Sequence, residues 1–297
     1  MSDFRLKVFL EVRRQLSFSK AAQLLFITQP AVSRHIHTLE EELGITLFQR
    51  TRQGVTITPE GEIYAEYAEE ILRLYEKGKF CADQFRNVYS GSLNIGASTT
   101  IAQYILPEYL AAFIHENQGI HVSLISGNTE EIEHLLTEKK IDIGFIEGLS
   151  GNPQLRYSGI GKDELVCVVR SGHPLAEKDS CSTADLFSYP WVLREQGSGS
   201  LEVLLSELKS HNISRKDFVT EAYLGSTESI KSYLSFSDCI SFVSVFSVKD
   251  ELLYQKLKIL DIPEIEIHRK LCSVELHGEQ SGIAKRFLDY LAHNIKL

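Results

Sequence analysis

The chain has 297 residues, 43% of them hydrophobic, and a formal net charge of −9. This length suffices for two domains with ordinary apolar cores. No apolar run reaches the length of a membrane span, and the N-terminus lacks the features of a signal peptide, so we expect a cytoplasmic protein with no membrane partner. The five cysteines show no C-x-x-C spacing, which argues against a disulfide framework and a zinc site and favours buried, reduced thiols.

The positive charge is confined to the first 58 residues, which carry eight Lys or Arg against five Asp or Glu. Residues 59–90 carry four against seven, and residues 91–297 carry nineteen against twenty-eight. The negative overall charge therefore hides a basic N-terminal segment. Such a segment on an acidic body is typical of a module that contacts phosphates.

The basic segment is expected to begin with three helices. Apolar residues at steps of three and four predict the first, and Ser17 is placed to cap a second helix that ends near Phe26. Thr28 caps a third helix over 28–43, and Gly44 is its expected C-cap. Two helices joined by so short a turn form a helix-turn-helix, in which the second helix enters the major groove of DNA.

The third helix has an apolar face and a polar face. Its apolar positions recur at helical spacing, which predicts that this face is buried: Ala31, Val32, Ile36, Leu39 and Leu43. The outward side chains can hydrogen-bond base edges or phosphate oxygens. The predicted DNA-contacting residues of the helix are Thr28, Gln29, Pro30, Ala31, Ser33, Arg34 and His37.

A small hairpin is expected after this helix, because β-branched residues flank Gln53-Gly54. Arg50 and Arg52 lie near its tip, where they would contact the phosphate backbone or the adjacent minor groove. Taken alone, the hairpin is equally well explained as a solvated surface element. Beside a helix-turn-helix, DNA contact is the better interpretation.

A long helix is predicted from Pro59 to about Tyr89, because no further proline occurs and an apolar stripe recurs at helical spacing. The stripe consists of Tyr64, Ala68, Ile71, Leu72 and Tyr75. A helix of this length has little of its own domain to pack on, so we predict that it pairs with a second copy. A dimer supplies the two-fold symmetry that matches a pseudo-palindromic site in double-stranded DNA.

The pattern changes at Gly91, after which strands and helices alternate. Strands are expected over 92–98, 121–126, 141–148, 164–170, 188–195, 217–222, 239–244 and 269–276. Helices are expected over 103–117, 129–138, 201–211, 227–236, 248–256 and 283–295. This alternation predicts a parallel sheet built from right-handed βαβ units.

No catalytic or cofactor motif is complete. The run 197–200 is not a G-x-S-x-G nucleophile elbow, because Gln196 precedes it and Ser200 ends it. Gly159 and Gly161 lack the third glycine of a dinucleotide fingerprint. His35 and His37 lie on different faces of one helix and cannot chelate one metal. We therefore predict no enzymatic activity, no catalytic residue, no metal and no cofactor.

The segment AAQLLFITQPAVSRHIHTLEEELGITLFQRT, followed by ITPEG, resembles the signature of the LysR-type transcriptional regulators almost position for position. The resemblance implies an α+β multidomain fold that ends in a two-lobed α/β effector domain similar to periplasmic binding proteins. The implied parts are a winged helix-turn-helix over 1–58, a linker and dimerisation helix over 59–89, and an effector domain over 90–297, with lobe I about 90–161 and 266–297 and lobe II about 162–265. The resemblance favours a homotetramer, a dimer of dimers, and leaves RNA polymerase as a candidate partner.

The resemblance also places a small-molecule effector between the lobes, in a part of the chain where the match is looser. The matching loops are 96–100, 141–148, 194–200 and 225–231. Carried over by local pattern, the effector-binding residues are Ser98, Thr99, Thr100, Glu147, Gly148, Arg194, Gly197, Ser198, Gly199, Ser200, Ser226 and Thr227.

Three of these loops carry small, hydroxylated residues directly before a predicted helix. Helix N-termini present free N–H groups and the positive end of the dipole, so three converging termini would favour an oxyanion or a carboxylate. The alternative is that each Ser or Thr only caps its own helix. Glu147, Glu195 and Glu228 complicate the charge balance, since they could hold an ammonium group of the effector, pair with Arg194 or face water.

Together these features predict a sequence-specific DNA-binding regulator of LysR type, modulated by a small anionic effector bound between two lobes. The competing interpretation is a two-lobed small-molecule-binding or enzymatic domain whose N-terminal helices serve only for oligomerisation. The confined basic segment and the expected absence of a secretion signal favour the regulator. Binding to a specific DNA fragment separates the two.

Overall fold

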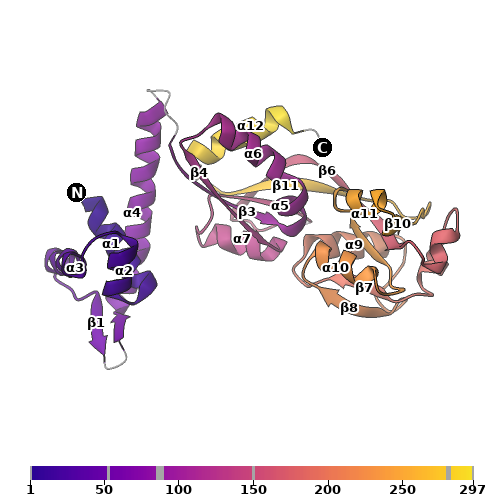
Figure 1. Ribbon diagram of the computed structural model, residues 1–297, viewed down its shortest axis with the longest axis horizontal. Coiled ribbons are helices and arrows are strands. Elements are labelled where there is room, and N and C mark those ends of the chain that lie inside the picture. Colours follow the sequence, from indigo (N-terminus) through magenta and orange to yellow (C-terminus); the bar gives the residue numbers. More distant parts are fainter. Residues whose placement is uncertain (1, 52–53, 85–89, 149–150, 279–281, 296–297) are drawn as a thin grey trace. The chain divides into compact units, whose positions relative to one another are not determined.

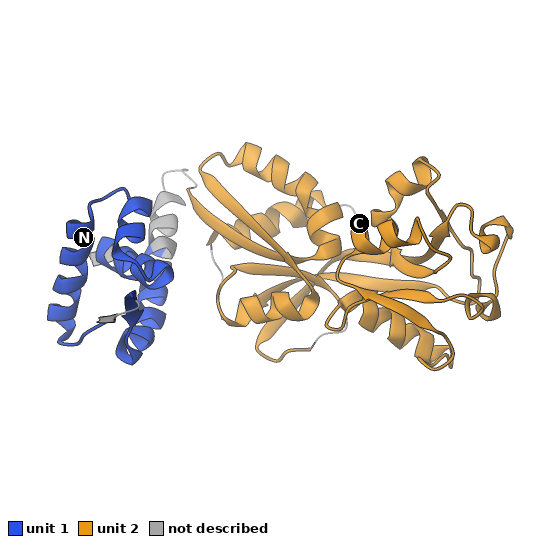
Figure 2. Cartoon of the chain, turned by 60° about the horizontal axis from the view of Figure 1, so that its bottom comes forward, with its two compact units in different colours: residues 1–88 blue, residues 89–297 orange. Residues whose placement is uncertain are grey.

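The computed structural model describes residues 2–51, 54–84, 90–148, 151–278 and 282–295; the side chains of some further residues, Arg50 among them, lie outside the described part. The chain divides into two compact units, residues 1–88 and 89–297 (Figure 2). No helix within the described residues is long and apolar enough to cross a membrane.

The first unit packs its helices and a hairpin around one apolar core (Figure 1). Its elements are α1 (Ser2–Gln15), α2 (Phe18–Leu24), α3 (Gln29–Leu43), β1 (Phe48–Thr51), β2 (Gly54–Ile57) and α4 (Pro59–Gln84). Phe9 of α1 is fully buried, and its ring centroid lies 5.5 Å from that of Phe48 and 5.4 Å from that of Tyr64. The aromatic contacts join α1, the hairpin and α4 into one body.

The ends of α3 follow the predicted signals. The Thr28 hydroxyl accepts a hydrogen bond from the Ala31 N–H at 3.4 Å, and Gly44 ends the helix with φ +67°. Val32, Ile36 and Leu39 are buried as predicted. The prediction is wrong for two other core positions: Ala31, at the edge of the apolar stripe, is only half-buried, and Leu43, the last residue of α3, is exposed.

The second unit contains a large mixed sheet with helices on both faces. Its strands are β3 (Gly91–Ser98), β4 (Ile120–Gly127), β5 (Ile143–Glu147), β6 (Leu155–Arg170), β7 (Trp191–Arg194), β8 (Thr220–Leu224), β9 (Ser241–Ser244), β10 (Leu257–Ile259) and β11 (Ile267–Leu276). Its α-helices are α5 (Thr99–Tyr104), α6 (Leu106–Glu116), α7 (Thr129–Thr137), α8 (Thr183–Leu186), α9 (Gly199–Ser210), α10 (Thr227–Leu234), α11 (Lys249–Leu253) and α12 (Gly282–Asn294). Two short 3-10 helices, η1 (Pro174–Glu177) and η2 (Val245–Ser247), lie between them.

The prediction of a purely parallel sheet is wrong. The order is β10-β6-β11-β5-β3-β4, with β9 also pairing with β6. In this sheet β3 pairs in parallel with β4 and β5, whereas β6 and β11 pair antiparallel with each other and with their other partners. A separate pair, β7 and β8, is also parallel. In Figure 1, α6 and α12 cover one face of the β3–β4–β5 region and α7 covers the other.

The long strands β6 and β11 connect two separate hydrophobic cores. Leu155 and Val274, at one end of the strand pair, belong to a core with α7, while Leu165 and Ile267, at the other end, belong to a core with α9. We refer to the parts around these cores as lobe I and lobe II. The predicted lobe boundary at 161–162 would lie inside β6, where the chain passes from one core to the other.

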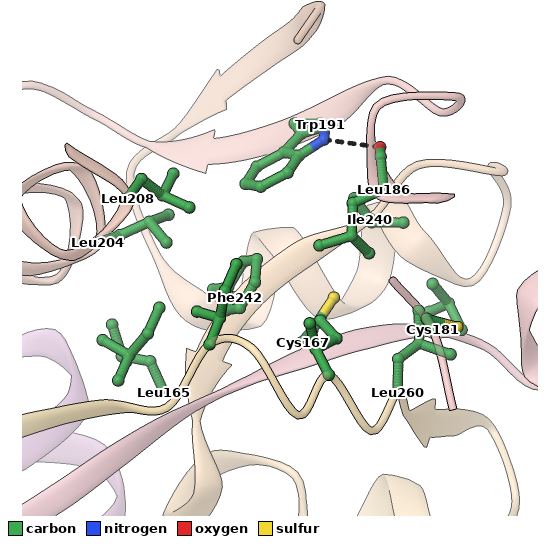
Figure 3. Close-up of a cluster of buried hydrophobic side chains, with 14 of the residues drawn as sticks. Leu165, Cys167, Cys181, Leu186, Trp191, Leu204, Leu208, Ile240, Phe242 and Leu260 are labelled. Atoms are coloured by element: carbon green, nitrogen blue, oxygen red, sulfur yellow. Dashed lines mark hydrogen bonds between the residues drawn. The ribbon is translucent and has the colours of Figure 1, made fainter. Parts of the chain in front are cut away.

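Trp191 of β7, the single tryptophan of the chain, lies in the core of lobe II (Figure 3). Its ring stacks on Phe218 at a centroid distance of 4.2 Å, and its indole N–H donates to the Leu186 carbonyl at 3.1 Å. Cys167 and Cys181 share this core, and burial raises the pKa of both thiols. These two cysteines are therefore the inert buried thiols that the sequence predicts, whereas Cys81 lies outside the described side chains.

The helix predicted over 103–117 is in fact two helices, α5 and α6. Ile105 separates them with φ −115° and ψ −60°, and Pro107 lies in the first turn of α6. Proline has no N–H to donate to the preceding turn, so a new helix starts at this position. The helix begins earlier than predicted, directly after β3, which places Thr99 and Thr100 in the first turn of α5.

Candidate DNA-binding surface and effector site

The outer surface of α3 carries the polar residues predicted to contact DNA. Thr28, Pro30, Arg34 and His37 are exposed, and Gln29, Ala31 and Ser33 are half-buried. The Gln29 amide donates to the Ser33 hydroxyl at 2.8 Å, which orients both side chains. Within the described part of the chain, Arg34 forms no side-chain hydrogen bond or ion pair, so its guanidinium is available to a base edge or a phosphate.

The predicted hairpin is present, with Phe48 opposite Ile57 and Thr51 opposite Gly54. Such a hairpin beside α3 gives the first unit the form of a winged helix-turn-helix. Arg52 and the side chain of Arg50 lie outside the described residues, so their role in the wing stays a prediction.

The helix α4 has two apolar faces, whereas the sequence predicted one. Ala65 and Ala68 are buried against the first unit, and Tyr64 and Leu72 pack beside them. A second row of apolar side chains is exposed: Ile63, Tyr67, Ile71, Leu74 and Tyr75. The predicted stripe thus mixed both faces, because the two apolar rows are neighbours on the helix surface and the stripe straddles the boundary between them. The exposed row is the one free to meet a second copy.

In the second unit, Glu147 joins three of the predicted loops. Its carboxylate accepts hydrogen bonds from the hydroxyl of Ser98, the N-cap of α5, and from that of Ser200, in the first turn of α9, at 3.2 Å. Its backbone carbonyl accepts from the Thr129 hydroxyl at 2.9 Å. Two of the helix N-termini proposed to bind an anion therefore converge on a carboxylate of the protein itself.

Arg269 of β11 supplies the counter-charge, and the sequence analysis missed it. Its guanidinium lies 3.2 Å from the Glu147 carboxylate and 2.6 Å from that of Asp163, and it donates to the Ser200 hydroxyl at 2.6 Å. The side chains of Arg269 and Asp163 are fully buried. Ser244 donates to the same Asp163 carboxylate at 2.9 Å. This buried network connects strands of both lobes with α9.

Gly199 brings the lobes into close contact beside this network. A Cβ atom at this position would lie 1.8 Å from the Glu147 carbonyl oxygen, so no other residue fits without moving the backbone. Gly148 and Gly197 lie at the same contact, close to Gly199 and to Glu130 respectively. These predicted effector residues therefore have a clear structural task where the lobes meet.

Four other predicted side chains each have a buried atom that lacks a hydrogen-bond partner among the described residues. The unpartnered atoms are Thr99 Oγ1, Thr100 Oγ1, Ser198 Oγ and Arg194 Nη1. Arg194 is held from one edge, since Glu195 accepts from its Nε at 2.8 Å and from its Nη2 at 2.9 Å. Buried polar groups are normally paired, so donors left open indicate a place for a ligand or for water.

In the loop before α10, the serine caps its own helix, which is the alternative to anion binding that the sequence left open. The Ser226 hydroxyl accepts from the Ser229 N–H at 3.1 Å, and Thr227 is buried behind it. This loop still lies beside Arg194, whose Nη2 is 3.5 Å from the Gly225 carbonyl oxygen. Ser98 also caps its own helix, accepting from the Ile101 N–H at 3.4 Å, so only Ser198 makes no cap hydrogen bond.

Tyr104 forms a second link between the lobes, which the sequence did not indicate. Its hydroxyl, at the end of α5, donates to the Glu228 carboxylate of α10, and Lys231 Nζ lies 5.1 Å from the centre of its ring. Burial and the Glu228 carboxylate raise the pKa of Tyr104 well above its ordinary value. The phenol therefore stays protonated and keeps its role as a donor.

Two family profiles together match most of the chain. The one described as the bacterial regulatory helix-turn-helix protein, lysR family, matches residues 4–62, and the LysR substrate binding domain matches residues 86–296. The HTH-type transcriptional regulator CysL of Bacillus subtilis (strain 168) is 34% identical over 266 residues, which are 90% of this chain and 88% of CysL.

Solved structures agree with this assignment. The regulatory domain of Synechocystis PCC6803 CcmR, in complex with 2-PG, has 31% identity and a TM-score of 0.63 over 69% of this chain and 97% of that chain. Full-length CbnR, complexed with its target DNA, has 20% identity and a TM-score of 0.69 over 99% of this chain and 100% of that chain, which shows a common fold. The chain belongs to the LysR family of DNA-binding transcriptional regulators and carries their effector-binding domain.

Proposed function

We propose that this regulator responds to a small oxyanion or carboxylate bound by Arg194, Thr99, Thr100 and Ser198. The observation that carries the proposal is the buried, unpartnered Nη1 of Arg194, together with three buried hydroxyls of the predicted effector loops that also lack a partner and can donate. An anion accepts hydrogen bonds from all four groups, and charge-assisted bonds of this kind are the strong ones. The CcmR regulatory domain, 31% identical, was solved with 2-PG, which supports a small ligand in a domain of this kind.

The distribution of open donors also favours an anion at Arg194. Arg269 already neutralises the buried carboxylate of Glu147, so the Ser98 and Ser200 hydroxyls are occupied within the protein. Among the described residues of the predicted effector loops, the open donors are Arg194 Nη1 and the three hydroxyls. We infer that the effector occupies this part of the cleft and that Glu147, Gly148, Gly197 and Gly199 shape the contact between the lobes.

Titration of the full-length protein with small anions tests this proposal. The probes are 2-phosphoglycolate, inorganic phosphate, sulfate and glycolate, each against potassium chloride at equal ionic strength, while the fluorescence of Trp191 follows thermal unfolding of lobe II. A bound anion is expected to raise the melting temperature in proportion to the logarithm of its concentration once that concentration exceeds its Kd. At 100 times the Kd the stabilisation is about 2.7 kcal/mol. A response no larger than that of potassium chloride, for every anion, would contradict the proposal.

We further infer that α3 reads the DNA sequence through Ser33 and Arg34. Ser33→Ala and Arg34→Ala are each expected to weaken specific binding by about 1–3 kcal/mol and to leave unfolding of the first unit unchanged, because both side chains face outward. Gel shifts with a selected fragment and with random DNA, at several salt concentrations, measure this. Unchanged affinity in both variants would show that another face of the unit contacts DNA.

The exposed apolar row of α4 is the surface through which two copies pair in this proposal. Pairing would cover Ile63, Tyr67, Ile71 and Leu74, which are otherwise open to water. Two paired copies present two α3 helices to a pseudo-palindromic operator, and two such dimers give the tetramer that the family resemblance favours. Anion binding between the lobes would then shift their closure and thereby the placement of the DNA-binding units.

A further inference from the structure

The turn between α2 and α3 holds the most exposed large apolar side chain among the described residues. Phe26 is 95% exposed, and its backbone has φ +54°, in the left-handed region. The Phe26 N–H donates to the Gln23 carbonyl at 3.3 Å, and the Ile27 N–H donates to the Ala22 carbonyl at 3.0 Å. These two bonds are the Schellman arrangement that ends a helix, with phenylalanine at the position that glycine usually occupies.

Phenylalanine is unfavourable here on two counts. A side chain with a Cβ is strained at positive φ, whereas glycine, and to a lesser degree asparagine, adopts this conformation readily. The ring also remains in water, although its burial would be favourable. Neither count is offset by a contact within the described part of the first unit, since Phe26 does not belong to its core cluster. The residue is therefore suited to a contact with another molecule.

The position of Phe26 identifies that molecule. It lies two residues before Thr28, the cap of α3, and three before Gln29, so its Cα lies within roughly 11 Å of that of Gln29. Its exposed ring is therefore close in the chain to the first residues that α3 presents to DNA. The major groove offers one apolar feature that an aromatic ring can cover, the C5-methyl group of thymine.

We propose that Phe26 contacts DNA by packing against a thymine methyl group at the edge of the sequence read by α3. The inference rests on the proposed reading of DNA by α3 and adds a specificity residue to it. The contact would remove both the ring and the methyl group from water. Phe26 would then select thymine over cytosine at one position of each half-site through shape and burial, without a hydrogen bond.

The test combines variants of Phe26 with removal of single thymine methyl groups from the DNA. Full-length Phe26→Gly and Phe26→Leu are compared with the wild type on a fragment that the wild type has selected from random DNA, with each thymine replaced in turn by deoxyuridine, which lacks the methyl group. At one thymine per half-site, wild-type affinity is expected to fall about four-fold, the equivalent of one buried methyl group. Phe26→Gly should bind the unmodified fragment more weakly than the wild type and lose no further affinity when that thymine is replaced by deoxyuridine. The affinity of Phe26→Leu should lie between those of the wild type and Phe26→Gly.

Stability gives an independent readout. Phe26→Gly is expected to leave the melting temperature of the first unit unchanged or higher, because glycine relieves the strained backbone. A variant that binds more weakly while folding at least as well cannot owe the loss to misfolding. A lower melting temperature, with loss of binding to all DNA alike, would show that Phe26 has a structural role and would overturn the inference.

Three further outcomes would overturn it. If Ser33→Ala and Arg34→Ala weaken specific binding but Phe26→Gly does not, α3 reads the DNA and Phe26 takes no part. If none of the three variants weakens specific binding, the proposed reading by α3 has itself failed. In the third outcome, Phe26→Gly changes the mass measured by sedimentation without DNA, and every deoxyuridine changes the affinity of Phe26→Gly and of the wild type equally. The ring then contacts a second copy of this chain instead of DNA.

Discussion

Replacing Arg269 by methionine is expected to lower the free energy of unfolding of the second unit by about 3–5 kcal/mol, the cost of removing one partner from a buried ion pair. Methionine fills much of the same volume but leaves the carboxylates of Glu147 and Asp163 without a counter-charge. Both are almost fully buried, so water cannot replace the guanidinium. Urea unfolding followed by the fluorescence of Trp191, the only tryptophan, measures the change within this unit.

Arg170 provides the matched control, because it pairs with Asp238 at the surface of the same unit. The Arg170 side chain is 35% exposed and that of Asp238 is 53% exposed. Arg170→Gln is therefore expected to cost at most about 1 kcal/mol. Adding Glu147→Gln to Arg269→Met should recover part of the loss, since it removes one of the two unpaired charges. Equal effects of Arg269→Met and Arg170→Gln would show that the buried network contributes little to stability.

Replacing Arg194 by methionine is expected to weaken binding of the stabilising anion by about 10- to 150-fold, the equivalent of one hydrogen bond to a charged group at about 1.5–3 kcal/mol. Methionine keeps the apolar stem but removes the unpartnered Nη1 that carries the proposal. Arg194→Lys should bind with intermediate affinity, because lysine keeps the charge and loses the planar arrangement of donors. Calorimetric titration with the best anion found for the wild type measures all three proteins.

Glu195→Gln is a control that is expected to change the affinity for the anion in the opposite direction. The Glu195 carboxylate pairs with Arg194 and offsets its charge, so the amide variant is expected to bind the anion more tightly. Arg170→Gln, which removes a guanidinium from the surface of the same unit, should leave affinity unchanged. Full affinity in Arg194→Met, together with an unchanged melting temperature, would place the effector elsewhere in the cleft.

The first unit could be predicted from sequence because its signals are local. Thr28 caps α3 and Gly44 ends it, and the spacing of Val32, Ile36 and Leu39 identifies the buried face. Each of these signals acts within one or two helical turns. The same kind of reasoning failed where packing decides, as for α4, whose two apolar faces become distinct only when one of them meets α1 and the hairpin.

The candidate effector site could be predicted only in part. The hydroxylated loops at Ser98, Ser198 and Ser226 were identified, yet their tasks differ, since Ser98 and Ser226 cap helices and Ser198 does not. Tyr104 and Arg269 carried no local signal. Arg269 meets Asp163 because β6 and β11 pair antiparallel with these two residues opposite each other, although more than a hundred residues of sequence separate them.

The amino-acid sequence by itself thus determined the winged helix-turn-helix, most of the order of strands and helices, and the family, because caps, periodicity and motif spacing act over short distances. The tertiary structure decided the mixed sheet, the buried network around Arg269, the open donors at Arg194 and the exposure of Phe26. The physical reason is that burial and charge pairing depend on which distant segments pack together. A carboxylate such as Glu147 can contact a ligand only if no guanidinium of the protein is paired with it, and the tertiary structure decides whether such a pair forms.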